Sequence, residues 1–433
     1  MKPKILLVNP PIYDFSAYDF WLKPYGLLEV AGQLEGQVEM VLFDYLDRIA
    51  AETETGHIPR EDTWHRGHFP QQRIAKPAAF KDIPRYLYRF GRNRDSFLRF
   101  LSDQQPFEFV LIQTVMTYWY LGVQEVIEDV RRIYPKARIV LGGVYATLCP
   151  AHAASIGADL VISGSNLSPL FDHLNLEPPS SPNPAWWKGY PGIESAAIKI
   201  TKGCPFRCTY CSVPLMGEPF SVRSIADCVA EVKRAASTGA EDIAFYDDAL
   251  LVRAEQGLLP FLETVQSEGL LLNFHTPNAL HCRFLSRDIA KRMVSGNVKS
   301  FYLGFESASV DWHNQTGRKV TCSELADAVE HLRSAGVDPH NITAYQIIGH
   351  PESECQQAEA TMEFIHSLGI RIMLADFSPI PGTPDGNRCN RFTDLSEPLN
   401  HNKTAFTIRR LSYESVGRLK DRCRQLNGQL PKS

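Results

Sequence analysis

The chain has 433 residues, of which 44% are hydrophobic and 22% charged, and its formal net charge is −4. This composition is typical of a folded protein with two or three domains, and it excludes a disordered chain, a collagen-like repeat and a coiled coil. Because the charge balance is slightly acidic, no global positive field attracts nucleic acid, and we expect no nucleic-acid partner.

The first residues carry a basic tip and a short apolar run, residues 5–8, that ends at Asn9-Pro10-Pro11. This run is too short for the apolar core of a signal peptide, so the sequence predicts a cytoplasmic protein. The longest apolar stretch, residues 109–123, is interrupted by Gln and Thr and falls short of the roughly 18 residues that a membrane span needs. We therefore expect no transmembrane helix, and cysteines that serve as reduced thiols or metal ligands.

The first third of the chain alternates short apolar runs with helical patterns. Val123, Val126, Ile127 and Val130 recur at helical spacing between two of these runs and mark the buried face of a helix. Strand, helix and strand in that order imply parallel pairing. We expect an α/β fold whose N-terminal domain, residues 1–177, is a doubly wound, Rossmann-like parallel sheet. Its predicted strands are residues 5–8, 41–43, 109–112, 139–141 and 160–162.

Residues 47–106 interrupt the alternation of strand and helix patterns. This segment is locally basic, with ten Lys or Arg against four Asp or Glu between positions 60 and 99. Two interpretations are open for this insertion: a solvated, partly helical excursion, or a lid or patch for an anionic ligand. Farther along, residues 178–184 hold four prolines among Ser and Asn, a composition typical of linkers. We therefore place a linker at residues 178–190.

The second half of the chain alternates strand and helix patterns regularly. This alternation predicts a partial (β/α)6 barrel over residues 191–385, with its chemistry at the carboxyl ends of the strands. Residues 386–433 are predicted to form a helical C-terminal extension that packs through an apolar stripe of Val416, Leu419, Cys423 and Leu426. The predicted strands are residues 196–200, 242–246, 272–275, 300–305, 342–347 and 372–377, and the helices are residues 222–236, 255–267, 286–295, 322–335 and 354–368.

One loop after the first barrel strand holds three cysteines at C-x3-C-x2-C spacing: Cys204, Cys208 and Cys211. Three thiolates so close together can converge on one metal centre, and soft sulfur ligands select iron–sulfur clusters, zinc or copper(I). A closed structural zinc site needs four ligands, and no second CxxC pair follows. Three ligands to a four-iron cluster leave one iron open, which suits catalysis. We predict these three cysteines as metal ligands.

This triplet, in a barrel of six units, resembles the radical S-adenosylmethionine (SAM) superfamily, and the resemblance spans residues 196–384. It implies a radical SAM enzyme whose three cysteines hold a [4Fe–4S] cluster, with SAM chelating the open iron. One electron then splits SAM into methionine and a 5′-deoxyadenosyl radical that abstracts hydrogen from the substrate. The resemblance also implies a small-molecule substrate and a reducing partner such as flavodoxin or ferredoxin.

Further segments resemble the family's SAM site in the same order. Tyr210 lies at the aromatic position that packs the cluster and adenine. The pair Asp247-Asp248 stands where the family usually has the Gly-Gly-Glu that meets the methionyl amine. Because adjacent strand residues point to opposite faces, only one of the two acids reaches SAM. We name Asp248 as the candidate, and the choice between Asp247 and Asp248 stays open at this point. Glu306 and Ser307 resemble the ribose-binding segment.

Three other residues complete the predicted barrel site. Gly349 lies in a segment that resembles the one beside adenine. His275 and Asn278 are placed at the end of the third strand, facing the barrel mouth, and two roles are open for them: contact with substrate or SAM, or hydrogen bonds that fix a turn. The seven remaining cysteines form no ligand-like group, so we expect no auxiliary cluster.

The order of doubly wound domain, linker and cysteine triplet resembles the branch with an N-terminal cobalamin-binding domain. Its cofactor-side loops resemble residues 115–120 and 141–147, and the candidate cobalamin residues are Tyr118, Gly142, Gly143 and Tyr145. Adjacent glycines let backbone approach a large planar ligand, and aromatic rings offer apolar faces. The motif D-x-H-x-x-G, which supplies a lower-axial histidine, is absent, so a bound cobalamin would lack that ligand. An aromatic interface without a cofactor is the open alternative.

The sequence leaves three functions open. The first is a SAM-derived radical acting on a small-molecule or lipid-like substrate, with or without cobalamin-borne methyl transfer. The second is a methylthiotransferase for RNA or protein, but those enzymes carry three further N-terminal cysteine ligands, and only Cys149 precedes Cys204 here. The third is a non-catalytic iron–sulfur or zinc protein that acts as a sensor or scaffold.

Overall fold

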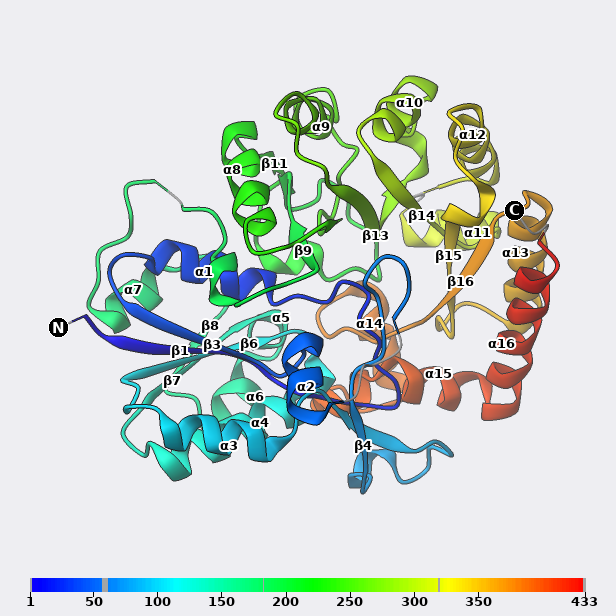
Figure 1. Cartoon of the computed structure of the whole chain (residues 1–433). Coiled ribbons are helices and arrows are strands. Elements are labelled where there is room, and N and C mark those ends of the chain that lie inside the picture. Colours follow the sequence, from blue (N-terminus) through cyan, green and yellow to red (C-terminus); the bar gives the residue numbers. More distant parts are fainter. Residues whose placement is uncertain (1, 57–60, 182, 318–319, 431–433) are drawn as a thin grey trace. The chain divides into compact units, whose positions relative to one another are not determined.

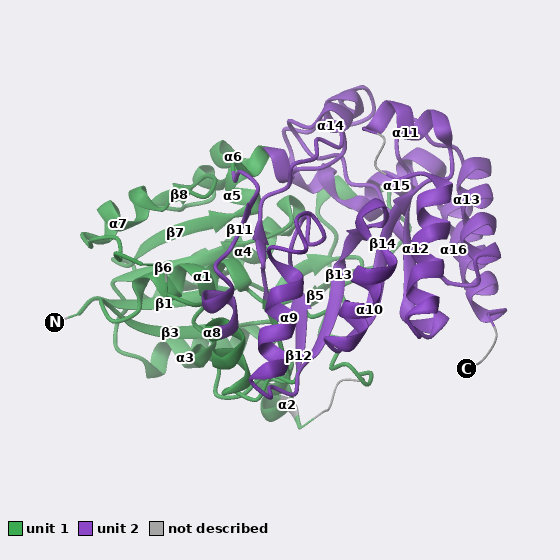
Figure 2. Ribbon diagram, turned by 90° about the horizontal axis from the view of Figure 1, so that it is seen from above, with its two compact units in different colours: residues 1–197, 215–217, 230–241 green, residues 198–214, 218–229, 242–433 purple. Residues whose placement is uncertain are grey.

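The computed structural model describes residues 2–56, 61–181, 183–317 and 320–430, which form two compact units (Figure 2). Unit 1 comprises residues 1–197, 215–217 and 230–241, and unit 2 comprises residues 198–214, 218–229 and 242–433. Parts of the predicted insertion (57–60), linker (182) and C-terminal extension (431–433) lie outside the described residues. Within the described ranges, no helix is both long and apolar enough to cross a membrane.

Unit 1 is built on a five-stranded parallel sheet, as the sequence predicts (Figure 1). Successive residues of a strand alternate between its faces, and both faces are covered. Ile5 and Leu7 pack with α1 (Tyr25–Leu34) and α7 (Ser168–Leu174) in one apolar cluster. The strands, in sheet order, are β3 (Glu39–Asp44), β1 (Lys4–Asn9), β6 (Phe109–Thr114), β7 (Arg138–Gly143) and β8 (Leu160–Ile162).

The remaining helices of unit 1 follow its strands. The predicted apolar face of residues 123–130 is buried in α4 (Tyr120–Ile133), which carries two arginines in its last turn, where cations favour the helix dipole. α3 (Arg94–Asp103) begins at Asn93, whose side chain accepts from the Asp95 amide. Two short helices, α5 (Val144–Leu148) and α6 (Pro150–Ser155), follow β7.

The basic insertion is a packed substructure rather than a solvated excursion. Its three-stranded antiparallel sheet has the order β2 (Ile12–Asp14), β5 (Leu87–Phe90) and β4 (Gln71–Ile74), and α2 (Arg48–Thr55) precedes it. Part of its positive charge is neutralised by acidic side chains of a neighbouring helix in unit 1. Arg89 forms a buried ion pair with Glu125 of α4, and Arg94 pairs with Asp129 on the same helix.

The predicted six strands of the second half form one sheet, each beside the one that precedes it in this set, so the sheet is a partial barrel. Five of the strands lie in unit 2, whereas residues 195–197 of the first strand are part of unit 1. The helices α9, α10, α12 and α13 lie along the outer side of this sheet (Figure 1). Several helix starts are capped: for example, Ser286 accepts from the Ile289 amide, and Thr321 and Glu324 form a capping box. The strands are β9 (Ser195–Ile198), β12 (Asp242–Phe245), β13 (Asn273–His281), β14 (Val298–Glu306), β15 (Ile342–Ile348) and β16 (Arg371–Asp376). The helices are α8 (Ile225–Ala236), α9 (Leu258–Ser267), α10 (Arg287–Ser295), α11 (Val310–Thr316), α12 (Cys322–Ser334) and α13 (Cys355–Ser367).

The segment predicted as a linker packs into unit 1, which corrects the expected boundary. Trp187 is fully buried, and the hydroxyl of Tyr190 donates to Asp44 Oδ2 at 2.5 Å. The Trp186 amide donates to the carbonyl of Leu28 in α1. The prolines therefore shape a chain that is held against the sheet and its helix, and unit 1 extends to residue 197 instead of ending at 177.

The C-terminal extension agrees with its prediction. It contains α14 (Pro384–Arg388), α15 (Lys403–Leu411) and α16 (Tyr413–Gly428). The stripe of Val416, Leu419, Cys423 and Leu426 is buried on α16, and Figure 1 shows that helix beside α13.

Candidate functional site

The cysteine triplet lies in a loop of unit 2 between two short antiparallel strands, β10 (Thr201–Lys202) and β11 (Ser221–Val222). Cys204, Cys208 and Cys211 are each half-buried. The Cys211 amide donates to the Cys208 carbonyl, which tightens the turn between them. All ten cysteines fall within the described ranges, and none forms a disulfide bond there. Half-exposed thiols gathered in one short loop fit the donor set of an iron–sulfur cluster.

A buried network anchors the middle of this loop to the segment after β16. The Thr209 hydroxyl donates to Asp385 Oδ2 at 2.5 Å, and the Asp385 amide donates back to the Thr209 carbonyl. His350 Nε2 lies 3.0 Å from the same carboxylate oxygen, and Arg388 donates to the other. Burial alone would raise the pKa of Asp385, but the hydrogen bonds from His350 and Thr209 and the nearby charges lower it. The carboxylate is therefore a fixed anion that holds the loop.

The two adjacent acids have different environments. Asp247 is buried, and its Oδ1 accepts from the Ile200 amide at 2.9 Å and from the Thr201 hydroxyl at 2.7 Å. Burial raises the pKa of Asp247 to about 6. Asp248 keeps 27% of its side chain exposed and has Lys199 Nζ at 3.9 Å. Asp247 thus fixes the strand that leads to the cysteine loop, and Asp248 is the acid with access to a ligand.

Tyr210 and Glu306 lie together beside the cysteines. Burial raises the pKa of Tyr210 well above its usual value, and the charges of Glu306, Cys208 and Cys211 raise it further. The Tyr210 ring packs on Trp312 of α11, with centroids 5.6 Å apart. Glu306 ends β14 with a φ of 71°, a left-handed conformation that is strained for a glutamate, and strained residues of this kind cluster at functional sites.

Ser307 and Gly349 are engaged in local structure. The Ser307 hydroxyl accepts from the Ser309 amide at 3.1 Å, and its carbonyl accepts from His313. Gly349 has a φ of 81°, and a Cβ there would lie 2.5 Å from the Thr407 hydroxyl of α15. The requirement for glycine at position 349 therefore comes from close packing on the C-terminal extension.

His275 does not lie where the sequence analysis places it. β13 continues to His281, so His275 is near the start of the strand, and it is fully buried. Its ring nitrogens contact Ser300 Oγ at 2.9 Å and Asp242 Oδ1 at 2.8 Å. We correct its assignment to a residue that joins three strands. Asn278 is exposed and donates to the Tyr246 carbonyl, directly before the acid pair.

The residues predicted for cobalamin are largely internal to unit 1. Tyr118 and Tyr145 are buried, and the Tyr145 hydroxyl lies 2.6 Å from His152 Nδ1. Gly143 has a φ of 110°, and a Cβ would lie 2.2 Å from the Thr114 carbonyl, so the turn itself requires glycine. Gly142 is half-buried beside it. The two tyrosines are core residues and offer no face to a ligand, which corrects that part of the prediction.

Unit 1 has a recess at a different position, with an empty volume of ≈380 Å³ that includes open solvent. It lies after β1 and β6, the neighbours from which the sheet grows in opposite directions. Ligands of doubly wound sheets bind at such a switch point, outside the carboxyl ends of the strands. The lining residues are Asn9, Pro10, Pro11, Ile12, Leu22, Lys23, Leu46, Gln113, Val115, Met116, Trp119 and Val123.

Sequence reasoning missed the loop anchor and most of this recess. Thr209, His350 and Asp385 meet only in three dimensions, although His350 adjoins Gly349, which the sequence singled out. The sequence signal for the recess was Asn9-Pro10-Pro11, a polar residue at the end of a buried strand that two prolines follow. These residues lie at the edge of the sheet where ligands of this fold class bind.

Comparison with known proteins gives one family model and several curated relatives, each of which matches part of the chain. Residues 198–365 match the family model described as the radical SAM superfamily. An uncharacterized methyltransferase of Pyrococcus horikoshii is 27% identical over 44% of this chain and 41% of its own length. A threonylcarbamoyladenosine tRNA methylthiotransferase of Thermotoga maritima is 25% identical over 60% of this chain and 64% of its own. The chain thus spans less than two thirds of the length of each of these curated relatives.

Solved structures share the fold along the whole chain. The radical SAM methyltransferase TsrM from Kitasatospora setae, solved with cobalamin and a [4Fe–4S] cluster bound, has a TM-score of 0.65 at 15% identity and covers 98% of this chain and 91% of its own. The cobalamin-dependent SAM radical enzyme OxsB has a TM-score of 0.56 at 12% identity, covering 100% of this chain and 63% of its own. The architecture of a doubly wound domain followed by a partial barrel is therefore shared with these enzymes.

Proposed function

We propose that this chain, whose residues 198–365 match the radical SAM family model, is an enzyme that holds a [4Fe–4S] cluster on Cys204, Cys208 and Cys211 and cleaves SAM beside it. The observation that carries the proposal is the loop itself: three half-buried thiols held by a buried carboxylate network. When bound, the cluster and SAM supply a low-potential electron and an adenosyl radical. The residues of this chain position them.

The SAM site is assigned to the carboxyl ends of β12 and β14. Glu306, strained and close to Tyr210, accepts hydrogen bonds from the ribose hydroxyls. Asp248 meets the methionyl amine, because Asp247 is committed to the backbone of residues 200–201. Tyr210 shields the cluster from water through its contact with Trp312. A carboxylate that accepts from a ligand in a partly buried site forms a charge-assisted and therefore strong hydrogen bond.

The reaction that we propose is methyl transfer through a corrinoid bound in unit 1, to a small-molecule or lipid-like substrate. The recess after β1 and β6 supports this assignment by its position, and its rim offers Met116 and Trp119 as apolar surfaces with Lys23 and Gln113 as polar groups. The fold shared with TsrM, a methyltransferase solved with cobalamin bound, supports it as well. Methylthiotransferase activity has less support, because a single cysteine precedes Cys204.

Anaerobic reconstitution tests the proposal. We expect about four iron and four sulfide per chain and, with a one-electron reductant, conversion of SAM to products. The Cys208→Ala variant should lose both. Cys355→Ala, which removes a thiol outside the triplet, is the matched control and should retain both. A protein that holds stoichiometric zinc and no iron, or that leaves SAM intact, would contradict the proposal.

A further inference from the structure

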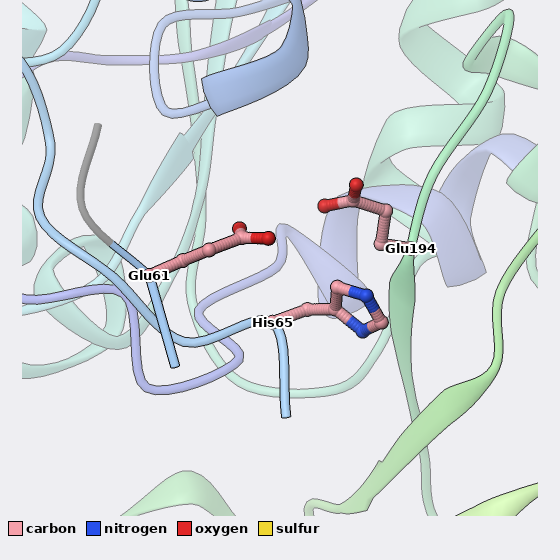
Figure 3. A group of neighbouring side chains, drawn as sticks. All are labelled: Glu61, His65 and Glu194. Atoms are coloured by element: carbon pink, nitrogen blue, oxygen red, sulfur yellow. The ribbon is translucent and has the colours of Figure 1, made fainter. Parts of the chain in front are cut away.

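We infer that unit 1 holds a second metal site, for a divalent transition-metal ion, formed by Glu61, His65 and Glu194. Among the described residues, these three side chains each place a ligand atom within 4.8 Å of those of the other two. Figure 3 shows the two carboxylates pointing toward one another with the imidazole beside them. All three belong to unit 1, and none takes part in the cysteine loop of unit 2.

The segment that carries Glu61 and His65 is a tight, hydrogen-bonded loop. Asp62 Oδ1 accepts from the amides of Trp64 and Arg66, and the Asp62 amide donates to the Arg66 carbonyl at 2.8 Å. The Trp21 indole donates to the Trp64 carbonyl at 2.8 Å, which ties the loop to a buried side chain. Because the loop is closed on itself, Glu61 and His65 keep their relative positions without a metal ion.

Arg48 holds two of the three proposed metal ligands in place through hydrogen bonds. Its guanidinium donates to Glu61 Oε2 at 3.0 Å and to the His65 carbonyl at 2.6 Å. Its charge is balanced by Asp19, whose Oδ2 lies 2.8 Å from Arg48 Nε in a buried ion pair. Arg48 and Asp19 thus cancel, and the carboxylates of Glu61 and Glu194 leave the group with a net negative charge. Ligands of metal ions are commonly held by such outer hydrogen bonds, and one carboxylate oxygen stays available for the ion.

The donor set decides which ion fits. Two carboxylates and one imidazole suit Zn²⁺, Mn²⁺ and Fe²⁺, whereas thiolates select the iron–sulfur chemistry of the other unit. Three protein ligands leave coordination positions for water, as in metal sites that keep an open position. Glu194 directly precedes β9, so a bound ion would join the loop of residues 61–67 to the strand that begins the barrel segment. The site would thereby stabilise unit 1 when it is filled.

Manganese is the probe that separates this site from the cysteines, because Mn²⁺ prefers oxygen and nitrogen donors to thiolates. The full chain, with its cluster reconstituted and oxidised, is titrated with Mn²⁺, and free Mn²⁺ is followed by electron paramagnetic resonance. The expected result is one bound Mn²⁺ per chain that Zn²⁺ displaces. Glu194→Gln and His65→Gln should each weaken binding by at least about tenfold. Glu39→Gln, which alters an exposed acid outside the group, should bind as the wild type does.

Melting temperatures show whether a variant that binds less Mn²⁺ is still folded. Without added metal, Glu194→Gln should melt at the wild-type temperature, and Mn²⁺ should raise the melting temperature of the wild type and of Glu39→Gln but not of Glu194→Gln. The inference is overturned if the reconstituted wild type binds neither Mn²⁺ nor Zn²⁺. It is equally overturned if Glu194→Gln and His65→Gln bind Mn²⁺ as tightly as the wild type.

Discussion

His350 and Asp385 form a fully buried pair, with the imidazole Nε2 3.0 Å from the carboxylate Oδ2. The same oxygen accepts from Thr209, which lies between the second and third cysteines of the candidate cluster loop. A segment after β16 therefore controls the geometry of a loop that follows β9. This relationship predicts that a substitution outside the three cysteines speeds the release of iron from the proposed cluster.

Thr209→Val tests the anchor, because it keeps the volume of the side chain and removes only the hydroxyl. A hydrogen bond to a charged acceptor contributes about 1.5–3 kcal/mol, so we expect iron to be released to a chelator about tenfold faster or more. Thr264→Val is the matched control, since its hydroxyl bonds only to the Pro260 carbonyl on its own helix. Equal rates of iron release from the two variants would show that Asp385 serves the fold and not the loop.

Glu306→Gln tests the ribose assignment. The amide keeps the shape of the side chain but loses its charge, and a charge-assisted hydrogen bond contributes about 1.5–3 kcal/mol. We expect SAM affinity, measured by calorimetry on reconstituted protein, to fall by roughly one to two decades while the iron content stays constant. Glu359→Gln changes an exposed acid on α13 and should have no effect. Undiminished affinity in Glu306→Gln would refute the role.

Much of the fold could be predicted from the sequence because its strands are continuous apolar runs between helical patterns. β1 and β14, for example, lie within a few residues of their predicted bounds. The ends of strands were harder to predict from the sequence. Residues 276–281 continue β13 beyond its predicted end, and the pairing with β14 resumes after a register shift between Thr276 and Leu280. Because β13 continues there, His275 became an interior residue instead of a residue at the mouth.

Side-chain partners across long sequence separations could not be predicted. The cysteine triplet is recognisable because its chemistry is local, but Thr209 and Asp385 are separated by 176 positions, and no periodicity relates them. The paired glycines at the end of β7 predict a turn, and the structure has one there. A Cβ on Gly143 would clash with the Thr114 carbonyl, so this backbone packing is by itself a reason for glycine at position 143. The recess depends on the order of β1 and β6 in the sheet, which strand patterns alone do not determine.

The Asp247→Asn variant tests whether Asp247 is the structural acid of the pair, and the test uses the pH dependence of the unfolding free energy. Burial raises the folded-state pKa of Asp247 to about 6, above the unfolded value of about 3.9. The folded state therefore binds the extra proton between these values, and stability falls as pH rises through that window. Asn keeps an oxygen for the Thr201 hydrogen bonds and has no such penalty.

The wild type should consequently lose about 1 kcal/mol relative to Asp247→Asn between about pH 5 and about pH 7.5. The measurement is the difference in unfolding free energy between the two proteins at each pH. Asp44, whose pKa burial also raises to about 6, titrates in both proteins and cancels in this difference. A difference that does not change with pH would mean that Asp247 is ionised in the folded state throughout this range. SAM affinity should be unchanged in Asp247→Asn and reduced in Asp248→Asn.

The recess of unit 1 provides the last prediction, because it relocates the proposed corrinoid site away from the buried tyrosines. Val115 lines the recess directly after β6 and is half-buried. A Val115→Trp side chain would occupy part of the ≈380 Å³ volume without reaching the core of the sheet. Gly143→Val would be a poor test, since its Cβ would clash with the Thr114 carbonyl and disturb folding whether or not a ligand binds there.

Wild-type protein incubated with hydroxocobalamin and then desalted should retain corrinoid absorbance, and Val115→Trp should retain at least about tenfold less, because a filled pocket excludes a ligand by steric overlap. Glu128→Trp adds the same bulk on an exposed position of α4 and should retain corrinoid as the wild type does. Iron content should be equal in all three proteins, because the cysteines lie in the other unit. If the wild type retains no corrinoid, the recess is no corrinoid site, and methyl transfer through cobalamin is excluded for this chain. If Val115→Trp retains as much as the wild type, the corrinoid binds elsewhere.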